Sequence, residues 1–317
     1  MEGVRPISCH SHNDYWRKKP LYEALQCGCT SVEADVWLVN DDLLVGHSRS
    51  SLQKEKTLWS LYVDPLVRLL DDQNHNQSTG EPIASTVKNG VFSEDPTQTL
   101  VLLVDVKDVD AQSVLPVISA HLSALRRKDY LSYWNGSELR SGPITVVLTG
   151  NAPFNMVNAP SAHRDIFFDA PLADLSEEPK SRYTNNVRSN LVASRNVSKH
   201  VTSIDSGTMS DSGSGAFVEF NVANSYFASV SFRKAIGYTW FGRLSSSQIK
   251  TIRGQIKEAQ RRGLKVRYWA TPTWPIAIRN HIWQILLDEG VDYLNVDDVW
   301  AAKKLLGMTE SLPLAVV

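Results

Sequence analysis

The sequence predicts an α/β protein, and within that class a (β/α)8 barrel of the TIM type. Short apolar segments rich in β-forming residues alternate with amphipathic segments almost from end to end of the 317 residues. Such alternation is typical of a parallel sheet covered by helices, and eight candidate strands match the barrel. A doubly wound open sheet is the alternative. The glycine-rich phosphate-binding turn that often follows the first strand of such a sheet is missing here.

The expected barrel strands are apolar runs bounded by polar or turn-forming residues. They cover residues 6–10, 31–37, 100–107, 144–149, 166–169, 226–231, 265–270 and 292–296. A short run at 43–47 follows the second strand so closely that we expect a hairpin return. Amphipathic segments lie between the strands, and several end in Gly, as helix C-termini prefer. They cover residues 20–28, 57–72, 113–128, 246–263, 278–290 and 300–307.

Two polar stretches exceed what a minimal barrel needs. Residues 72–98 are rich in Asn, Gln, Ser and Pro, and residues 172–222 are rich in Ser, Gly and Asn. Segments of this composition and length do not build a packed core. We therefore predict that both are insertions or loops of a single barrel domain that covers residues 1–317.

Composition and charge exclude several classes of function. Hydrophobic residues make up 42% of the chain, enough for a substantial core, and the net charge is −1. Global electrostatics therefore predict neither a nucleic-acid partner nor an anionic membrane, although a local patch stays open. No apolar run approaches the ~20 residues of a transmembrane segment. The N-terminus shows no signal peptide, which favours the cytoplasm; the compartment and the oligomeric state are otherwise open.

Three cysteines occur, at positions 9, 27 and 29. An odd count this small argues against a disulfide framework, and the Cys27-x-Cys29 spacing fits neither a zinc knuckle nor a redox pair. We expect all three to be small buried residues with no redox role.

Carboxylates interrupt the second expected strand, "SVEADVW". Side chains alternate between the two faces of a strand, so the apolar residues at 32, 34 and 36 face the helices. Glu33 and Asp35 then point into the barrel. Buried parallel strands normally read as continuous apolar runs, which makes two carboxylates on the interior face unusual.

Similar pairs of ionisable residues end two other strands. Asp105 and Lys107 share the interior face of "LVDVKD", and His10 and His12 lie two residues apart in "CHSHND". Buried charges carry a desolvation cost unless they are compensated. Three such pairs at strand ends indicate a functional site at the carboxyl end of the barrel.

The convergence of Glu33, Asp35 and Asp105 would call for nearby positive charge. Lys107 supplies one cation, and Mg²⁺ or Ca²⁺ is the natural second, because both prefer carboxylate oxygens. Zinc would want more histidine or cysteine. A cation beside a lysine and histidines suits an anionic phosphoryl centre, where the metal and lysine stabilise charge and the histidines move protons. His47, which closes the 43–47 run, is a further candidate.

In order and spacing, these residues resemble the glycerophosphodiester phosphodiesterase-type barrels. These barrels belong to the phospholipase-C-like phosphodiesterases, and the likeness is greatest to the sphingomyelinase D-type phospholipases of spider venom. Two longer strings, "HSHNDYWRKKPLYEAL" and "GLKVRYWATPTWP", are similar to the fungal altered inheritance of mitochondria protein 6 family, and that likeness runs over nearly the whole chain. The short motifs are H-x-x-N, E-x-D, G-H and D-x-K, which here are His10 with Asn13, Glu33 with Asp35, His47, and Asp105 with Lys107.

The resemblance implies a phospholipase-C-like phosphodiesterase barrel with a metal held by Glu33, Asp35 and Asp105. It also implies that His10 and His47 form the acid/base pair and that Lys107 stabilises phosphate charge. Trp269 matches a tryptophan that lines the substrate pocket of the venom enzymes.

The chain also departs from these families. Ser-His follows the first histidine where glycerophosphodiesterases have Arg-Gly, and the disulfide-closed loop of the venom enzymes is missing after His47. His12 has no counterpart, so a catalytic, supporting or structural role stays open. We assign Asn13, His12 and Trp269 to substrate binding, together with Asn295, which ends the last strand where barrel sites are built.

The predicted function is that of a metal-dependent phosphoric diester hydrolase, or a cyclising phosphodiesterase, acting on a glycerophosphodiester or phospholipid-type substrate. One histidine would activate water or a substrate hydroxyl, and the other would protonate the leaving oxygen. Mg²⁺ or Ca²⁺ and Lys107 would hold the phosphoryl oxygens. One alternative is a metal-dependent barrel lyase acting on a carbon centre, although that class draws its carboxylates from later strands. The other is a non-catalytic phosphate- or phospholipid-binding barrel.

Overall fold

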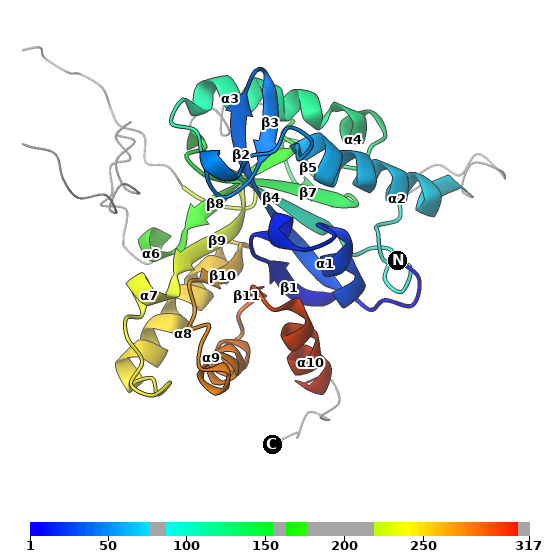
Figure 1. Cartoon of the computed structure of the whole chain (residues 1–317). Helices are drawn as coiled ribbons and strands as arrows, with labels where there is room; N and C mark the ends of the chain where they lie inside the picture. The colour runs from blue at the N-terminus through cyan, green and yellow to red at the C-terminus, as the bar shows by residue number, and fades with distance from the viewer. Residues whose placement is uncertain (76–86, 155–162, 176–218, 310–317) are drawn as a thin grey trace, which may run out of the picture. The chain divides into compact units, whose positions relative to one another are not determined.

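Eight parallel strands close into a barrel in the computed structural model of the chain (Figure 1). The strand order is β1-β11-β10-β9-β8-β7-β4-β2, and a pairing between β1 and β2 joins the two ends. The structure describes residues 1–75, 87–154, 163–175 and 219–309. The closing pair excludes an open sheet, so the predicted (β/α)8 barrel is confirmed.

Each barrel strand overlaps the segment that the sequence predicts for it. A ninth strand, β3 (Asp42–Val45), pairs antiparallel with β2, which confirms the hairpin return. Two very short strands, β5 (Tyr133–Trp134) and β6 (Leu139–Arg140), were not predicted because two residues leave no periodic pattern. The barrel strands are β1 (Ile7–Ser11), β2 (Cys29–Val39), β4 (Leu100–Val106), β7 (Ile144–Gly150), β8 (Ile166–Pro171), β9 (Ser225–Ser231), β10 (Lys265–Trp269) and β11 (Tyr293–Val296).

All six predicted amphipathic segments contain helices. The segment 113–128 forms two helices that meet at Leu122, and α8 begins at a capping box formed by Ser245 and Gln248. The described helices are α1 (Tyr22–Cys27), α2 (Asp64–Asn74), α3 (Ala111–His121), α4 (Ser123–Arg127), α6 (Leu172–Leu175), α7 (Phe232–Ala235), α8 (Ser246–Arg261), α9 (Ile276–Asp288) and α10 (Val299–Thr309). Short 3₁₀ or π turns cover Asp14–Trp16, Arg49–Ser51 and Trp59–Val63. None of the described helices has the length and apolar character needed to cross a bilayer.

The barrel interior changes character along its axis. At the amino side it is apolar, with a buried cluster of Val101, Leu103, Val147, Phe167, Phe227 and Tyr293. Towards the carboxyl ends the interior positions become ionisable, with Glu33, Asp35, Asp169 and Arg267 all buried. The apolar floor completes the core, and the polar layer above it positions the candidate site.

One expectation about the cysteines was wrong. All three are buried as predicted, but Cys9 and Cys29 form a disulfide between β1 and β2, leaving Cys27 as the free cysteine of the described residues. The cause is the strand register, which places Ile7 opposite Cys29 and shifts before His10. The two Cα atoms therefore lie 4.5 Å apart. The number and spacing of the cysteines, on which the prediction rested, do not reveal the strand register.

The first predicted insertion lies partly, and the second largely, outside the described residues. Residues 76–86 of the first and 176–218 of the second are not described. Of the remainder, residues 87–98 form turns that lead into β4, and 172–175 form α6. The barrel elements belong to one compact unit made of 1–176 and 220–317, and the second unit, 177–219, is not described apart from Glu219.

Candidate active site

Three carboxylates converge at the carboxyl ends of neighbouring strands. Asp35 on β2 lies opposite Asp105 on β4, and Glu33 precedes Asp35 on the same face. One carboxylate oxygen of each residue lies within 4.8 Å of the others. The structure thus brings together all three metal ligands that the resemblance implied.

This cluster fits a hard divalent cation. Asp35 Oδ1 and Asp105 Oδ1 are buried and have no hydrogen-bond partner, although buried polar atoms in proteins are nearly always paired. Their other oxygens face Lys107, whose Nζ lies 2.6 Å from Asp105 Oδ2 and 3.1 Å from Asp35 Oδ2. Two unpartnered carboxylate oxygens beside a third carboxylate are ligands that Mg²⁺ or Ca²⁺ prefers.

Electrostatics within the cluster point the same way. Burial and the negative charge of Asp105 raise the pKa of Asp35 to about 7, and burial likewise raises the pKa of Asp105. Although burial opposes it, the attraction of both carboxylates raises the pKa of Lys107. A single ammonium group therefore leaves the cluster with excess negative charge, which a cation would neutralise.

This excess charge predicts a pH dependence for the metal-free protein. The pKa of Asp35 is raised from 3.8 to about 7, so its protonation stabilises the fold at low pH and that stabilisation is lost as pH rises through about 7. We compare the melting temperatures of EDTA-treated wild-type protein and of the Asp35→Asn variant. As the pH rises from 3.8 to about 7, the wild-type value should fall relative to that of the variant. Calorimetry at several pH values measures this difference. Parallel profiles for the two proteins would show that Asp35 ionises normally.

Gly150 makes room for one of the carboxylates. It ends β7 with φ of 71°, and a Cβ added there would lie 2.0 Å from Asp105 Oδ1. Only glycine tolerates both this backbone conformation and such a close approach. Sequence reasoning missed Gly150, whose only signal is a glycine at the carboxyl end of a strand beside Asp105.

His10 lies inside the barrel, fully buried, rather than at its mouth. Its Nδ1 is 2.7 Å from Ser31 Oγ, and its Nε2 is 3.2 Å from Glu33 Oε2 and 3.0 Å from Arg267 Nη1. Arg267 can only donate, and it has another acceptor at 2.9 Å in Asn295 Oδ1. With hydrogen on Nε2 the ring donates to Glu33 and accepts from Ser31, and with hydrogen on Nδ1 it donates to Ser31 and accepts from Arg267.

The surroundings keep His10 neutral. Burial and the positive charge of Arg267 lower its pKa to about 4. The pKa of Glu33 is lowered, because the hydrogen bond from His10 and the nearby positive charges outweigh the opposing effect of burial. The neutral imidazole contacts both Ser31 and Glu33, so His10 is placed to orient the Glu33 carboxylate, and its acid/base role stays a prediction.

His12 lies at the mouth of the barrel, just past the end of β1, with 31% of its side chain exposed. Its Nδ1 is 2.7 Å from Asp297 Oδ1, and its Nε2 is 4.0 Å from Glu33 Oε2. Burial opposes protonation, but the hydrogen bond to Asp297 and the two carboxylate charges outweigh it and raise the pKa of His12. This carboxylate-histidine pair is a feature of general acids and bases.

The β2–β3 hairpin places His47 at the mouth of the barrel, on the same rim as His12. Gly46 N–H donates to Asp35 O at 3.0 Å, and Trp37 Nε1 donates to Gly46 O at 2.7 Å, which fixes the end of the hairpin. The His47 side chain is 57% exposed, and its Nδ1 lies 3.5 Å from Asp35 Oδ2. Its ring lies 5.2 Å from that of Trp16, centroid to centroid.

Tyr15, which sequence reasoning missed, connects the two sides of the rim. Its hydroxyl lies 2.7 Å from both Asp35 Oδ2 and Asn13 Oδ1, and 3.5 Å from His47 Nδ1. Asn13, predicted to bind substrate, is buried, and its amide Nδ2 lies 3.5 Å from His12 Nδ1. Asn13 is therefore placed to position Tyr15 and His12, and no sequence pattern separates this role from substrate contact.

Arg267 is the second residue that sequence reasoning missed. It is buried, and its guanidinium donates to Asp169 Oδ2 at 3.0 Å, Asn295 Oδ1 at 2.9 Å and Ser229 Oγ at 3.1 Å. The side-chain oxygen of Asn295, a residue predicted to bind substrate, thus accepts a hydrogen bond from Arg267. Arg267 lies within a predicted strand, and its partners on β8, β9 and β11 are far away in sequence, so no local motif marked it.

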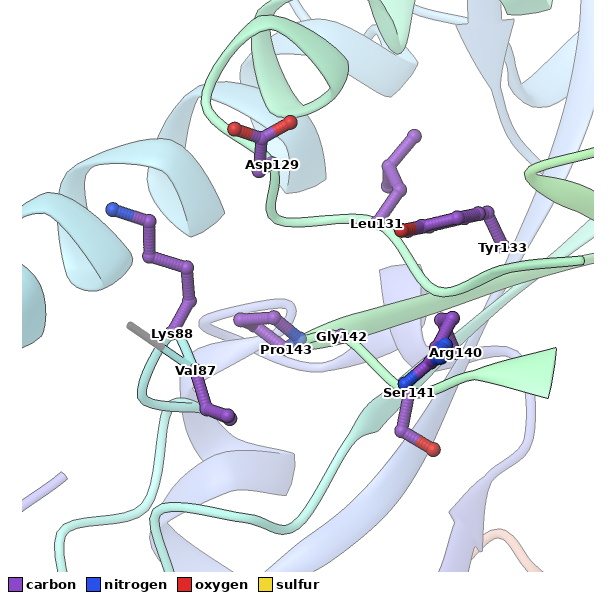
Figure 2. A pocket seen from close by; sticks show the side chains of 9 residues that line it. All are labelled: Val87, Lys88, Asp129, Leu131, Tyr133, Arg140, Ser141, Gly142 and Pro143. Carbon is purple, nitrogen blue, oxygen red and sulfur yellow. The ribbon is translucent and has the colours of Figure 1, made fainter. Parts of the chain in front are cut away.

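Trp269 ends β10 at the same rim and is 38% exposed, and its contact with substrate stays a prediction. A pocket of about 260 Å³ lies elsewhere, next to Pro143 at the amino end of β7. Figure 2 shows its lining side chains, among them Lys88, Tyr133 and Arg140, and none of them belongs to the carboxylate cluster. That pocket is separate from the candidate active site.

Comparison with known proteins agrees with this geometry. The AIM6-like phosphodiesterase domain family matches residues 1–169, more than half of the chain, including the carboxylates and both rim histidines. The altered inheritance of mitochondria protein 6 homolog of Arthroderma benhamiae is 38% identical over 95% of this chain and 84% of its own length. The proteins of that name from Eremothecium gossypii and Saccharomyces cerevisiae are 36% and 34% identical over 93% and 96% of this chain, and over 68% and 72% of their own lengths.

No solved structure matches the chain with significance. The family match and the relatives together extend over almost the whole chain, and they confirm the resemblance to the altered inheritance of mitochondria protein 6 family that the two longer strings carry. The chain belongs to the altered inheritance of mitochondria protein 6 family and carries its phosphodiesterase-like domain.

Proposed function

We propose that the protein is a metal-dependent phosphodiesterase in which His12 and His47 form the acid/base pair. The observation that carries this proposal is the arrangement of two solvent-accessible histidines, His12 half-buried and His47 exposed, around three converging carboxylates. His12 Nε2 lies 4.0 Å from Glu33, and His47 Nδ1 lies 3.5 Å from Asp35. Both rings are thus within reach of a substrate bound at the cluster, whereas His10 is sealed inside the barrel.

Glu33, Asp35 and Asp105 would hold Mg²⁺ or Ca²⁺, which would supply charge stabilisation at the phosphoryl oxygens. Lys107 already lies against two of these carboxylates and adds a second positive charge at the same place. The phosphate group of a diester would bind beside this cationic centre. The site is therefore suited to a substrate whose reacting phosphorus carries negatively charged oxygens, and less suited to a neutral substrate.

The two histidines divide the proton transfers. Asp297 favours the protonated form of His12, so His12 is placed to give a proton to the leaving oxygen. His47 would take a proton from the attacking hydroxyl, either of water or of the substrate itself. Attack by water gives hydrolysis, and attack by a substrate hydroxyl gives a cyclic phosphate. A glycerophosphodiester or a phospholipid fits both outcomes.

The test of the function is turnover of a substrate panel. Bis-p-nitrophenyl phosphate, glycerophosphodiesters, lysophospholipids and sphingomyelin would each be incubated with Mg²⁺, Ca²⁺ or EDTA, and the products identified by mass spectrometry. We expect turnover that EDTA abolishes and a divalent cation restores. Folded protein that binds the cation and turns over no member of the panel would favour the alternative of a non-catalytic phosphate-binding barrel.

The histidine assignment has its own test. His12→Ala and His47→Ala should each lower kcat by about 10²–10⁴-fold, the usual contribution of a general acid or base, while the melting temperature changes little. His10→Ala should lower the melting temperature more than either of these variants, because it leaves the Ser31 hydroxyl buried without its partner and removes one of the partners of Glu33. His281→Ala, an exposed site on α9, is the matched control. A His12→Ala variant with full activity would return the acid/base role to His10.

A further inference from the structure

Exposed aromatic side chains gather on two segments that follow β9 and β10. Tyr238, Trp240 and Phe241 lie on the first segment and Trp274 on the second, and each of the four is 79% to 81% exposed. Ile276, at the start of α9, is 60% exposed. Exposed aromatic residues in such a group mark an interaction surface, because isolated ones are ordinary but clusters are not. We name these five residues the aromatic rim.

The two segments pack against each other. A Cβ placed on Gly242 would lie 3.4 Å from Ile278 Cγ2, so the first segment contacts the helix α9 that the second segment begins. Within the first segment, the rings of Trp240 and Phe241 meet edge to face at 5.5 Å. The two segments that carry the aromatic rim are therefore neighbours.

Phe241 adopts a backbone conformation that bulky residues avoid. Its φ is 50°, in the left-handed region that favours glycine. Its side chain is nevertheless exposed and gains no burial from this conformation. A strained backbone that places an aromatic ring in solvent does not stabilise the fold, and it indicates that the ring contacts a binding partner.

The two segments that carry the aromatic rim contain basic residues and no acidic ones. Residues 232–250 and 270–281 contain no Asp or Glu, although the whole chain has a net charge of −1. Arg233, Lys234 and Arg243 are exposed beside the aromatic rim, and the Arg233 guanidinium lies 5.1 Å from the centre of the Tyr238 ring. Basic side chains around exposed aromatic rings complement a partner surface that has a negatively charged outer layer and an apolar layer below it.

The aromatic rim shares one end of the barrel with the candidate active site. β9 and β10 run parallel, with Ser231 opposite Trp269, so both segments leave the barrel at the carboxyl rim. Trp269 itself immediately precedes the second segment. A surface docked on the aromatic rim therefore faces the same side as the mouth of the barrel.

We propose that the aromatic rim docks the protein onto anionic phospholipid bilayers. Tryptophan and tyrosine rings favour the boundary between headgroups and acyl chains, and nearby Lys and Arg add attraction to anionic headgroups. This inference deepens the proposed function by naming a bilayer phospholipid as the source of substrate. Binding to the bilayer does not itself require turnover, so the two can fail separately.

Sedimentation of the full chain with vesicles tests the proposal. Two compositions would be compared, pure phosphatidylcholine and phosphatidylcholine with about a third phosphatidylserine. We expect binding to the anionic vesicles, and at least about 10-fold weaker partitioning for the triple variant Trp240→Ala, Phe241→Ala, Trp274→Ala. Trp300→Ala, an exposed tryptophan on α10 outside both segments, is the matched control and should bind normally.

Activity on soluble bis-p-nitrophenyl phosphate separates this proposal from the proposed function. The triple variant should keep the wild-type rate, because it changes no residue of the carboxylate cluster. Wild-type protein that turns over the soluble diester but does not bind vesicles would overturn the docking surface alone. Vesicle binding without any turnover would leave the docking surface standing and count against the phosphodiesterase. Equal binding of the triple variant and the wild type, or a second copy of the chain covering the aromatic rim in solution, would also overturn the proposal.

Discussion

Replacing Asp105 by Asn is expected to abolish both cation binding and phosphodiester turnover. Asp105 Oδ1 is buried without a partner, and its Oδ2 lies 2.6 Å from Lys107 Nζ. The variant keeps the shape of the side chain but replaces a charged ligand by a neutral amide. We expect kcat/KM to fall on the order of 10³-fold or more, because cation stabilisation of phosphoryl charge amounts to several kcal/mol.

Three measurements check this result: calorimetric titration with Mg²⁺, the shift in melting temperature on adding Mg²⁺, and the turnover rate. Wild-type protein should be stabilised by Mg²⁺, because a ligand that binds only the folded state raises its stability. The variant should show no such shift. Asp288→Asn, on the exposed surface of α9, is the matched control. Loss of turnover with normal Mg²⁺ stabilisation would contradict the ligand role of Asp105 and leave it a purely electrostatic one.

Arg267→Met is expected to be the most destabilising single substitution in the barrel interior. It removes the ion-pair partner of Asp169, whose carboxylate is almost fully buried, and a donor to Asn295 and Ser229. Removing one member of a buried ion pair costs about 3–5 kcal/mol, because the remaining charge is left uncompensated. At about 2–4 °C per kcal/mol for a domain somewhat smaller than this one, the melting temperature should fall by roughly 10 °C.

Thermal and urea unfolding measure this loss. Arg253→Met, which breaks an exposed pair with Glu289, is the matched control and should change stability little. The double variant Arg267→Met, Asp169→Leu should recover part of the loss, since replacing both charges removes the uncompensated one. A single variant as stable as the control would show that Asp169 is neutral in the folded protein, in line with the tendency of burial to raise its pKa.

The sequence predicts most of the architecture because each strand and helix has its own local pattern. The carboxylates at 33, 35 and 105 were found for the same reason, since a period of two puts them on the interior face. The same period cannot separate His10 from His12, which share a face and differ in depth along the barrel axis. That difference depends on where β1 ends, at Ser11, and on Arg267, which reaches His10 from β10.

The remaining failures have a related cause. The Cys9–Cys29 disulfide depends on a register shift between two strands, and the contacts of Tyr15 depend on the turn that follows β1. Strand register and turn conformation are both properties that the pattern of apolar residues does not reveal. Chemistry at a barrel mouth is built from strand ends and turns, so part of the site becomes visible only in three dimensions.

The β2–β3 hairpin has a consequence for how such a site can be inherited. The continuous stretch 29–47 carries Glu33, Asp35 and His47, and the backbone bond from Gly46 to Asp35 fixes the last two to each other. The two proposed metal ligands, Glu33 and Asp35, and the proposed base His47 thus lie on one short continuous segment, which recombination can transfer as a unit. A barrel that acquires this stretch would still need a carboxylate and a lysine from the neighbouring strand, and a second histidine, to complete the proposed site.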